Sequence, residues 1–279
     1  EAFASQGIEF EAVLVCPHFA RDACECRKPR IGLVQHYLAD ASVDLSRSWV
    51  IGDRETDLEL ARNLGIRGLR VRRRGASEET WPAAARRILA RRAHVERTTK
   101  ETRIRVDVDL DSAEVVRART GIGFFDHMLE QLAKHGGFAL ELACEGDLHI
   151  DEHHTIEDCA LALGEALRRA LGDKVGIARY GFLLPMDESR AQIAIDLSGR
   201  PYAQFEGRFG RDQVGGLPTE LVPHFFRSLA ESLGAAIHVS VTGENTHHMI
   251  EACFKGVGRA LRGAVRREGS DLPTTKGVL

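Results

Sequence analysis

The chain has 279 residues, of which 43% are hydrophobic and 28% charged, and its formal net charge is −3. This composition is typical of a soluble globular protein and excludes collagen-like, low-complexity and disordered chains. The length is about twice that of a typical domain, which favours two domains or one large one. We find no run of about 18 uncharged apolar residues and no signal-peptide pattern, so we expect a soluble, cytoplasmic protein without a membrane partner.

The distribution of charges and cysteines bears on two further classes, nucleic-acid-binding proteins and disulfide-rich proteins. Residues 1–92 carry 16 basic and 13 acidic side chains and residues 93–279 carry 22 and 28, so neither part is basic enough to predict a nucleic-acid partner. Three of the six cysteines lie within eleven residues, whereas Cys144, Cys159 and Cys253 are isolated. This distribution favours a metal site plus buried thiols over a disulfide framework.

The three clustered cysteines frame a histidine. Cys16, His18, Cys24 and Cys26 form the pattern C-x-H-x5-C-x-C, which places four nitrogen and sulfur ligands within eleven residues. Such a set suits a closed tetrahedral Zn²⁺ site better than chance thiols do. The sequence therefore predicts a zinc site near the N-terminus.

A short apolar segment, residues 49–51, is typical of a strand and leads into GDRETD, residues 52–57. Asp53 and Asp57 would then lie at the carboxyl end of that strand, where their oxygens suit Mg²⁺. Lys28, in the CRKPR loop, could hold a phosphoryl group. These features are typical of the edge of a phosphatase site.

An arginine-rich stretch closes this part of the chain. It runs from Gly68 through Arg73 and Arg74 to Arg92, with a helix-start signal at Trp81-Pro82. Because no aromatic residues interleave with the arginines, an RNA or phosphate role is disfavoured. We interpret the stretch as a solvated linker and helix, and we assign it no function.

The second part begins with a strand pattern and a helix pattern. Apolar residues alternate with polar ones from Ile104 to Leu110, as in a half-buried strand. Residues 124–135 switch to helical spacing and end at Gly136-Gly137. A second domain, residues 93–279, is therefore predicted.

This second part contains an internal duplication. DHMLEQLAKHGGFALEL (126–142) matches HFFRSLAESLGAAIHV at an offset of 97, and HHTIEDCALALGEAL (153–167) matches HHMIEACFKGVGRAL (247–261) at an offset of 94. Both copies have the order helix with a leading histidine, strand, and HHxxE opening another helix. Two copies of one α+β unit predict a domain with pseudo-twofold symmetry.

The HHxxE repeat predicts metal binding. On a helix, residues i and i+4 share a face and residue i+1 is rotated by about 100°. His153 and Glu157 can therefore bind one ion, whereas His154 must point elsewhere. The second copy repeats this arrangement with His247, Glu251 and His248.

Two metal sites follow, each built from elements of both repeats or of neighbouring chains. His127 and His224, at equivalent helix starts, would complete sets of about three imidazoles and one carboxylate, leaving positions open for water or substrate. Spacing alone leaves Mn²⁺, Fe²⁺, Co²⁺ and Zn²⁺ open. It also leaves open another metal-dependent hydrolase or oxygenase, or a structural shell in which metal ions join subunits.

Eight motifs across residues 94–279 resemble imidazoleglycerol-phosphate dehydratase. They are TKET (99–102), GIGFFDHML (121–129), DEHHTIED (151–158), ARYGFLLPMDE (178–188), DLSGRPY (196–202), HFFRSL (224–229), HHMIEACFK (247–255) and LPTTKGVL (272–279). The resemblance implies a hydro-lyase of histidine biosynthesis that converts imidazole glycerol phosphate into imidazole acetol phosphate. It also implies paired Mn²⁺ ions and a homo-oligomer of 24 subunits.

The resemblance further implies the fold and the residue roles. The fold would be α+β, with two duplicated halves of mixed four-stranded sheets packed on helices, ribosomal S5 domain 2-like. Glu101 would transfer a proton and bind substrate. The implied metal ligands are His127, His153, His154, Glu157, His224, His247, His248 and Glu251, and the implied phosphate-binding residues are Arg179, Arg200, Lys255, Thr275 and Lys276.

Residues 1–92 resemble the second half of a histidinol-phosphate phosphatase of the haloacid dehalogenase class, an α/β Rossmannoid domain joined to the dehydratase in bifunctional proteins. That class uses an aspartate nucleophile in a DxD motif on its first strand. The printed chain starts at Glu1 and contains no such motif before Cys16. We therefore expect about half of this domain to be missing, and no phosphatase activity from this polypeptide alone.

Overall fold

The computed structural model describes residues 9–40, 42–72, 80–274, 276 and 279. Its contacts divide the chain into two compact units, Glu1–Leu89 and Ala90–Leu279. This division lies just before the predicted boundary between residues 92 and 93, which stays a prediction. Arg73 and Arg74 of the predicted linker lie outside the described residues.

The first unit contains one parallel strand pair with its connecting helix. Strand β1 pairs with β2 in parallel, and α1 links them. The strand predicted at residues 49–51 and the helix predicted to start at Trp81-Pro82 are both present and are confirmed. Leu69 and Val71 are buried together with Ala84 of that helix. Its elements are the 3₁₀ helices η2 (Ala20–Asp22), η3 (Gln35–Leu38) and η4 (Leu45–Arg47), followed by β1 (Trp49–Gly52), α1 (Glu55–Leu64), β2 (Arg67–Arg70) and α2 (Trp81–Leu89).

The second unit holds two matching halves. Its first half comprises β3 (Arg92–Thr98), β4 (Thr102–Asp109), β5 (Val116–Arg119), α3 (Gly123–Gly136), β6 (Ala139–Gly146) and α4 (His153–Leu171). Its second half comprises β7 (Tyr180–Met186), β8 (Ser189–Asp196), β9 (Tyr202–Glu206), α5 (Leu221–Leu233), β12 (Ala236–Thr242) and α6 (Thr246–Ala264), with the short pair β10 (Gln213–Val214) and β11 (Leu217–Pro218) inserted before α5. The order of elements is the same in both halves, as the duplication predicts.

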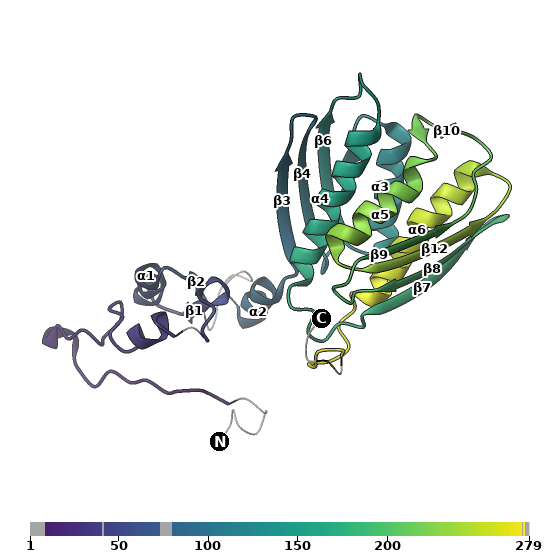
Figure 1. Ribbon diagram of the computed structural model, residues 1–279. Helices are drawn as coiled ribbons and strands as arrows, with labels where there is room; N and C mark the ends of the chain where they lie inside the picture. The colour runs from purple at the N-terminus through teal and green to yellow at the C-terminus, as the bar shows by residue number, and fades with distance from the viewer. Residues whose placement is uncertain (1–8, 41, 73–79, 275, 277–278) are drawn as a thin grey trace. The chain divides into compact units, whose positions relative to one another are not determined.

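Each half forms a mixed four-stranded sheet. The orders are β3-β4-β6-β5 and β7-β8-β12-β9, and in each sheet only the last pair is parallel. The four helices lie between the two sheets, as Figure 1 shows. Helix α4 packs against α5, and α3 against α6, so both helix pairs combine elements of the two repeats.

Sequence periodicity explains these layers. In β4 the apolar side chains Ile104, Val106 and Val108 are buried against the helices, while the alternating charged residues face outward. Helix α3 ends at Gly136, and the following residue, Gly137, adopts a left-handed conformation that glycine tolerates. Between α3 and α6 a Cβ on Gly258 would lie 2.3 Å from the Leu132 carbonyl oxygen, so a glycine permits this close approach.

The predicted fold class, α+β with duplicated halves and mixed four-stranded sheets packed on helices, is confirmed. All six cysteines are free, and Cys144, Cys159 and Cys253 are buried, as the cysteine spacing predicts. In the part of the chain that the structure describes, no helix has both the length and the apolar character needed to cross a bilayer.

Candidate active site and metal centres

The first histidine cluster, His153, Glu157 and His224, joins α4 to α5. Glu157 Oε2 lies 3.5 Å from His153 Nε2 and 3.6 Å from His224 Nε2, and the two imidazole rings are 4.8 Å apart. His224 Nε2 is buried and has no hydrogen-bond partner among the described residues. Two ligands that share one ion at about 2.1 Å are about 3 to 3.5 Å apart, so these residues fit a divalent cation.

The second histidine cluster, His127, His247 and Glu251, joins α3 to α6. Glu251 Oε1 lies 3.6 Å from His127 Nε2, and Glu251 Oε2 lies 3.7 Å from His247 Nε2. Glu251 is 7% exposed and also pairs with Lys255 Nζ at 2.9 Å. Burial acts to raise the pKa of Glu251, but the hydrogen bond and charge of Lys255 together with the two histidines lower it overall. The Glu251 carboxylate is therefore held in its ligating, ionised form.

The second histidine of each pair joins neither cluster. His154 Nδ1 lies 3.0 Å from Asp147 Oδ2, and His248 Nδ1 lies 2.9 Å from Glu188 Oε2. A carboxylate that accepts the Nδ1–H fixes the ring orientation and leaves Nε2 as the free lone pair, which is how ligating histidines are usually supported. The expectation that these side chains point away from His153 and His247 is therefore met.

These contacts also shift the protonation equilibria. The hydrogen bond that His154 donates to Asp147 raises the pKa of His154, and the hydrogen bond that His248 donates to Glu188 raises the pKa of His248. In return, the contact with His248 lowers the pKa of Glu188 to about 2. The Glu188 carboxylate is thus an ionised acceptor at neutral pH.

Glu101 lies in the turn between β3 and β4. Its N–H donates to Thr99 Oγ1 at 3.2 Å, and its carbonyl oxygen accepts the Asp147 N–H at 3.1 Å. Its exposed carboxylate has no hydrogen-bond or ion-pair partner within the described ranges. The backbone of Glu101 is therefore fixed while its side chain is available to a substrate.

The residues predicted to bind phosphate lie in more than one place within a single chain. Arg179, Arg200 and Lys276 line a hollow of about 530 Å³, whereas Lys255 lies at the second histidine cluster. Thr275 falls outside the described residues. The hollow itself therefore offers three cations from this set.

Arg179 is the most constrained of these cations. It has a left-handed backbone, with a φ of 69°, and its guanidinium pairs with Asp196 through Nε at 2.5 Å and Nη2 at 2.9 Å. The Asp196 contact raises the pKa of Arg179, so this side chain stays charged. A fixed cation of this kind suits a phosphate dianion.

The first unit brings its four predicted zinc ligands together. Cys26 Sγ lies 3.3 Å from Cys16 Sγ, 3.4 Å from Cys24 Sγ and 3.1 Å from His18 Nδ1. All four ligand atoms lie within 4.8 Å of one another, although the residues come from loops rather than from a core. This is the spacing that a single tetrahedral ion requires.

The predicted phosphatase residues, unlike the zinc ligands, do not form one cluster. Asp57 is buried at the start of α1, where its carboxylate accepts from the Arg54 N–H and pairs with Lys28 Nζ at 2.5 Å. Burial opposes ionisation, but the Lys28 contact keeps the pKa of Asp57 low. Asp53 is exposed at the carboxyl end of β1. Asp57 and Lys28 thus satisfy each other.

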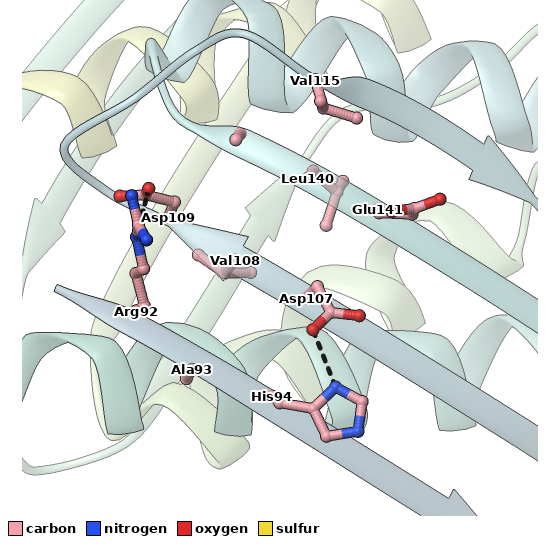
Figure 2. A pocket seen from close by; sticks show the side chains of 10 residues that line it. Arg92, Ala93, His94, Asp107, Val108, Asp109, Val115, Leu140 and Glu141 are labelled. Carbon is pink, nitrogen blue, oxygen red and sulfur yellow. Dashed lines mark hydrogen bonds and ion pairs between the residues drawn. The ribbon is translucent and has the colours of Figure 1, made fainter. Parts of the chain in front are cut away.

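A further hollow of about 310 Å³ lies on the outer face of the first sheet and contains none of the predicted site residues. Figure 2 shows two cross-strand pairs in it, His94 with Asp107 and Arg92 with Asp109. Each pair joins residues opposite each other on β3 and β4. Because these side chains are paired with each other, the hollow offers no reactive group comparable to the histidine clusters.

Sequence reasoning missed the two carboxylates that orient His154 and His248. Asp147 follows β6 and Glu188 lies in the β7–β8 turn, so neither has a helical spacing to its histidine. The two carboxylates also come from different places in the two repeats, so the duplication did not point to them.

Comparison with known proteins agrees with this geometry. A family model described as imidazoleglycerol-phosphate dehydratase matches residues 120–261, and one described as HAD-hydrolase-like matches residues 25–95. Among solved structures, the dehydratase of Pyrococcus furiosus in complex with (S)-C348 is 37% identical with a TM-score of 0.59, covering 66% of this chain and 100% of its own. The dehydratase of Staphylococcus aureus N315 is 35% identical with a TM-score of 0.57, covering 63% of this chain and 99% of its own.

Curated relatives cover the whole chain. The histidine biosynthesis bifunctional protein HisB of Stenotrophomonas maltophilia R551-3 is 57% identical over 282 residues, covering 100% of this chain and 79% of that protein. HisB of Xanthomonas oryzae pv. oryzae PXO99A is 54% identical over 300 residues, covering 100% of this chain and 80% of that protein. The duplicated histidine helices, the family models and these relatives together place the chain in the bifunctional HisB family of histidine biosynthesis, as an imidazoleglycerol-phosphate dehydratase that also carries part of a haloacid dehalogenase-like phosphatase region.

Proposed function

We propose that the two histidine clusters bind a pair of Mn²⁺ ions that hold the substrate during dehydration. The observation that carries this proposal is the buried, unpartnered Nε2 of His224 facing the Glu157 carboxylate. Imidazole and carboxylate ligands with open positions suit several borderline divalent ions, and the family resemblance selects Mn²⁺ among them. The proposed ligands are His127, His153, His154, Glu157, His224, His247, His248 and Glu251.

In this proposal His154 and His248 bind metal ions outside the two clusters of their own chain. Asp147 and Glu188 fix their Nδ1 atoms, which leaves Nε2 of each ring as the nitrogen for a metal ion. We propose that each of these rings ligates an ion held by a cluster of a neighbouring copy of the chain. Each ion would then have a third imidazole beside the two imidazoles and one carboxylate of a single-chain cluster. The proposed assembly is accordingly a homo-oligomer, of 24 subunits by family resemblance.

When bound, the ions supply Lewis-acid stabilisation and orient the imidazole ring of the substrate. Glu101 accepts the carbon-bound proton on a carboxylate oxygen and passes it to the hydroxide that leaves the adjacent carbon, so one molecule of water is lost. The enol that remains tautomerises to the ketone of imidazole acetol phosphate. The rigid turn that holds the Glu101 backbone keeps this carboxylate in position. Glu101 is the proposed catalytic residue.

The phosphate end of the substrate needs fixed positive charge. We assign this role to Arg179, Arg200 and Lys276 of the hollow, together with Lys255 and Thr275. Lys255 contacts Glu251 rather than the hollow, so its proposed phosphate contact would come from the side of the second histidine cluster. The partner is thus a small phosphorylated imidazole, and we propose a cytoplasmic location without a nucleic-acid partner.

Metal removal tests this proposal. Protein stripped by a chelator should lose dehydration of imidazole glycerol phosphate by about 10³-fold, because Lewis-acid stabilisation is worth several kcal/mol. Adding Mn²⁺ back should restore turnover, with Mg²⁺ as the matched control that prefers all-oxygen sites. Turnover that survives complete metal removal, measured by elemental analysis of the assayed sample, would contradict the proposal.

We also propose a structural zinc ion held by Cys16, His18, Cys24 and Cys26 in the first unit. Replacing Cys24 by Ser should remove about one equivalent of zinc and destabilise this unit, because such sites contribute folding free energy directly. Zinc content and limited proteolysis of the full chain measure both effects, with Cys253→Ser as the control at a buried thiol outside the cluster. Unchanged zinc content in the Cys24 variant would refute the assignment.

The remaining proposals concern the phosphatase part. We propose Asp53 as the Mg²⁺ ligand, because its exposed carboxylate follows the carboxyl end of β1. Lys28 is the proposed phosphoryl-binding cation, and its present partner Asp57 holds it beside the same strand end. We place the boundary between this part and the dehydratase at residues 92 and 93.

A further inference from the structure

The turn that carries Glu101 is organised around one hydroxyl group. Thr99 Oγ1 accepts the N–H groups of Glu101 at 3.2 Å and of Thr102 at 2.9 Å, and the Thr99 N–H donates to the Thr102 carbonyl oxygen at 2.9 Å. The backbone on both sides of Glu101 is therefore tied to the same two threonines. Anything that moves those threonines moves Glu101.

Asp158 of α4 holds these threonines in place. Asp158 is 8% exposed, and its Oδ2 accepts the Thr102 hydroxyl at 2.6 Å and lies 3.5 Å from Thr99 Oγ1. Its Oδ1 accepts from Arg97 of β3, through Nη2 at 2.7 Å and Nε at 3.2 Å. One largely buried carboxylate thus ties the end of β3, the turn and the start of β4 to the helix that carries the first histidine cluster.

The duplication supplies an internal comparison. At an offset of 94, Asp158 corresponds to Ala252, so the second repeat has no carboxylate at this place. Glu188 stands immediately before β8 as Glu101 stands immediately before β4. The Glu188 carboxylate is occupied, however, by the His248 ring, the Asn245 N–H and the Ser189 hydroxyl.

The two turns have therefore taken different roles. In the first repeat the orienting of His154 falls to Asp147, and the turn acid Glu101 keeps an unoccupied carboxylate among the residues the structure describes. In the second repeat the turn acid itself orients the histidine. The repeat whose turn acid is unoccupied is the one with a buried anchor beneath the turn.

We propose that Asp158 is a positioning residue for Glu101, setting the place of the proton-transfer carboxylate relative to the metal ligands on α4. The inference rests on the proposed role of Glu101. Asp158 follows Glu157 directly on the helix, so the anchor and a metal ligand move as one rigid element. A misplacement of about 1 Å at such a group can lower a rate by about 10²-fold.

Asp158→Asn in the full, Mn²⁺-loaded chain tests the inference. The variant keeps the side-chain size but weakens the bonds to Arg97 and Thr102, and we expect kcat for dehydration of imidazole glycerol phosphate to fall by about 10²-fold with a much smaller change in KM. Bound manganese per chain should stay at the wild-type level. Glu165→Gln is the matched control, because Glu165 pairs with Arg169 on the same helix and has no link to the turn.

A double variant separates positioning from general damage. If Asp158 acts through Glu101, adding Asp158→Asn to Glu101→Gln should cause almost no further loss of kcat. Losses that multiply, a wild-type kcat in Asp158→Asn, or a parallel loss of manganese would each overturn the inference. If Glu101→Gln alone keeps full activity, the role proposed for Glu101 fails first, and that result is distinguishable from the others.

Thr102 provides a second route if Asp158→Asn does not fold. Thr102→Val removes the hydroxyl that bonds to Asp158 at nearly constant shape, and it should lower kcat as Asp158→Asn would. Thr102→Ser keeps the hydroxyl and should restore most of the rate. Equal, wild-type rates in both variants would overturn the inference.

Discussion

Alanine in place of His153 or of His247 is expected to lower kcat by about 10³-fold. Each histidine belongs to one cluster, with Nε2 3.5 Å and 3.7 Å from its helix carboxylate, so each substitution removes one ligand of one ion. Loss of an ion removes Lewis-acid stabilisation worth several kcal/mol. Elemental analysis should show manganese reduced by about half in either variant.

His94→Ala is the matched control for this experiment. His94 lies on the outer face of the first sheet, paired with Asp107, and contacts neither cluster. Its loss should leave kcat and metal content unchanged, because an exposed ion pair contributes little. Full manganese occupancy in both cluster variants, or equal losses in the control, would contradict the ligand assignment.

Glu101→Gln is expected to lower kcat by about 10²- to 10⁴-fold, the range that general acid–base groups contribute. Glutamine keeps the hydrogen-bonding shape but cannot accept the substrate proton. Because the carboxylate has no partner among the described residues, the substitution breaks no contact in the fold. Thermal unfolding and bound manganese should therefore match the wild-type protein.

The same variant separates a catalyst from a purely structural metal shell. A scaffold would assemble and show no turnover before or after the substitution, whereas a catalyst assembles in both forms and loses its rate in the variant. Glu145→Gln, at an exposed position of β6 facing Arg103, is the matched control and should keep the wild-type kcat. Unchanged dehydration in Glu101→Gln would remove Glu101 from the mechanism.

Local patterns in the sequence were sufficient for several elements. Alternation from Ile104 to Leu110 gave β4, and the helical spacing ending at Gly136-Gly137 gave α3, because burial on one face imposes a period that the chain displays directly. The i, i+4 relation put His153 beside Glu157 and turned His154 away. The roles of Glu101, Arg179 and Arg200 came from family resemblance, because a single charged residue forms no spacing pattern that would indicate a function.

Contacts between distant segments were beyond sequence reasoning. The zinc set is close in sequence, so its four ligands were visible as a pattern, whereas Asp147, Glu188 and Asp158 reach partners across turns and strands. Lys255 was grouped with the phosphate residues by resemblance, which stays a prediction, and its contact with Glu251 became visible only in the structure. Such pairings depend on which side chains meet after folding.

The sequence alone determined that there are two copies of one unit and that each copy carries a histidine pair, a carboxylate and a leading histidine. Which copy completes which cluster was decided only by the packing of α4 on α5 and of α3 on α6 between the two sheets. The physical reason is that helical period fixes the face of a ligand along its own helix, while its neighbour on another helix is fixed by the burial of both apolar faces in a common core.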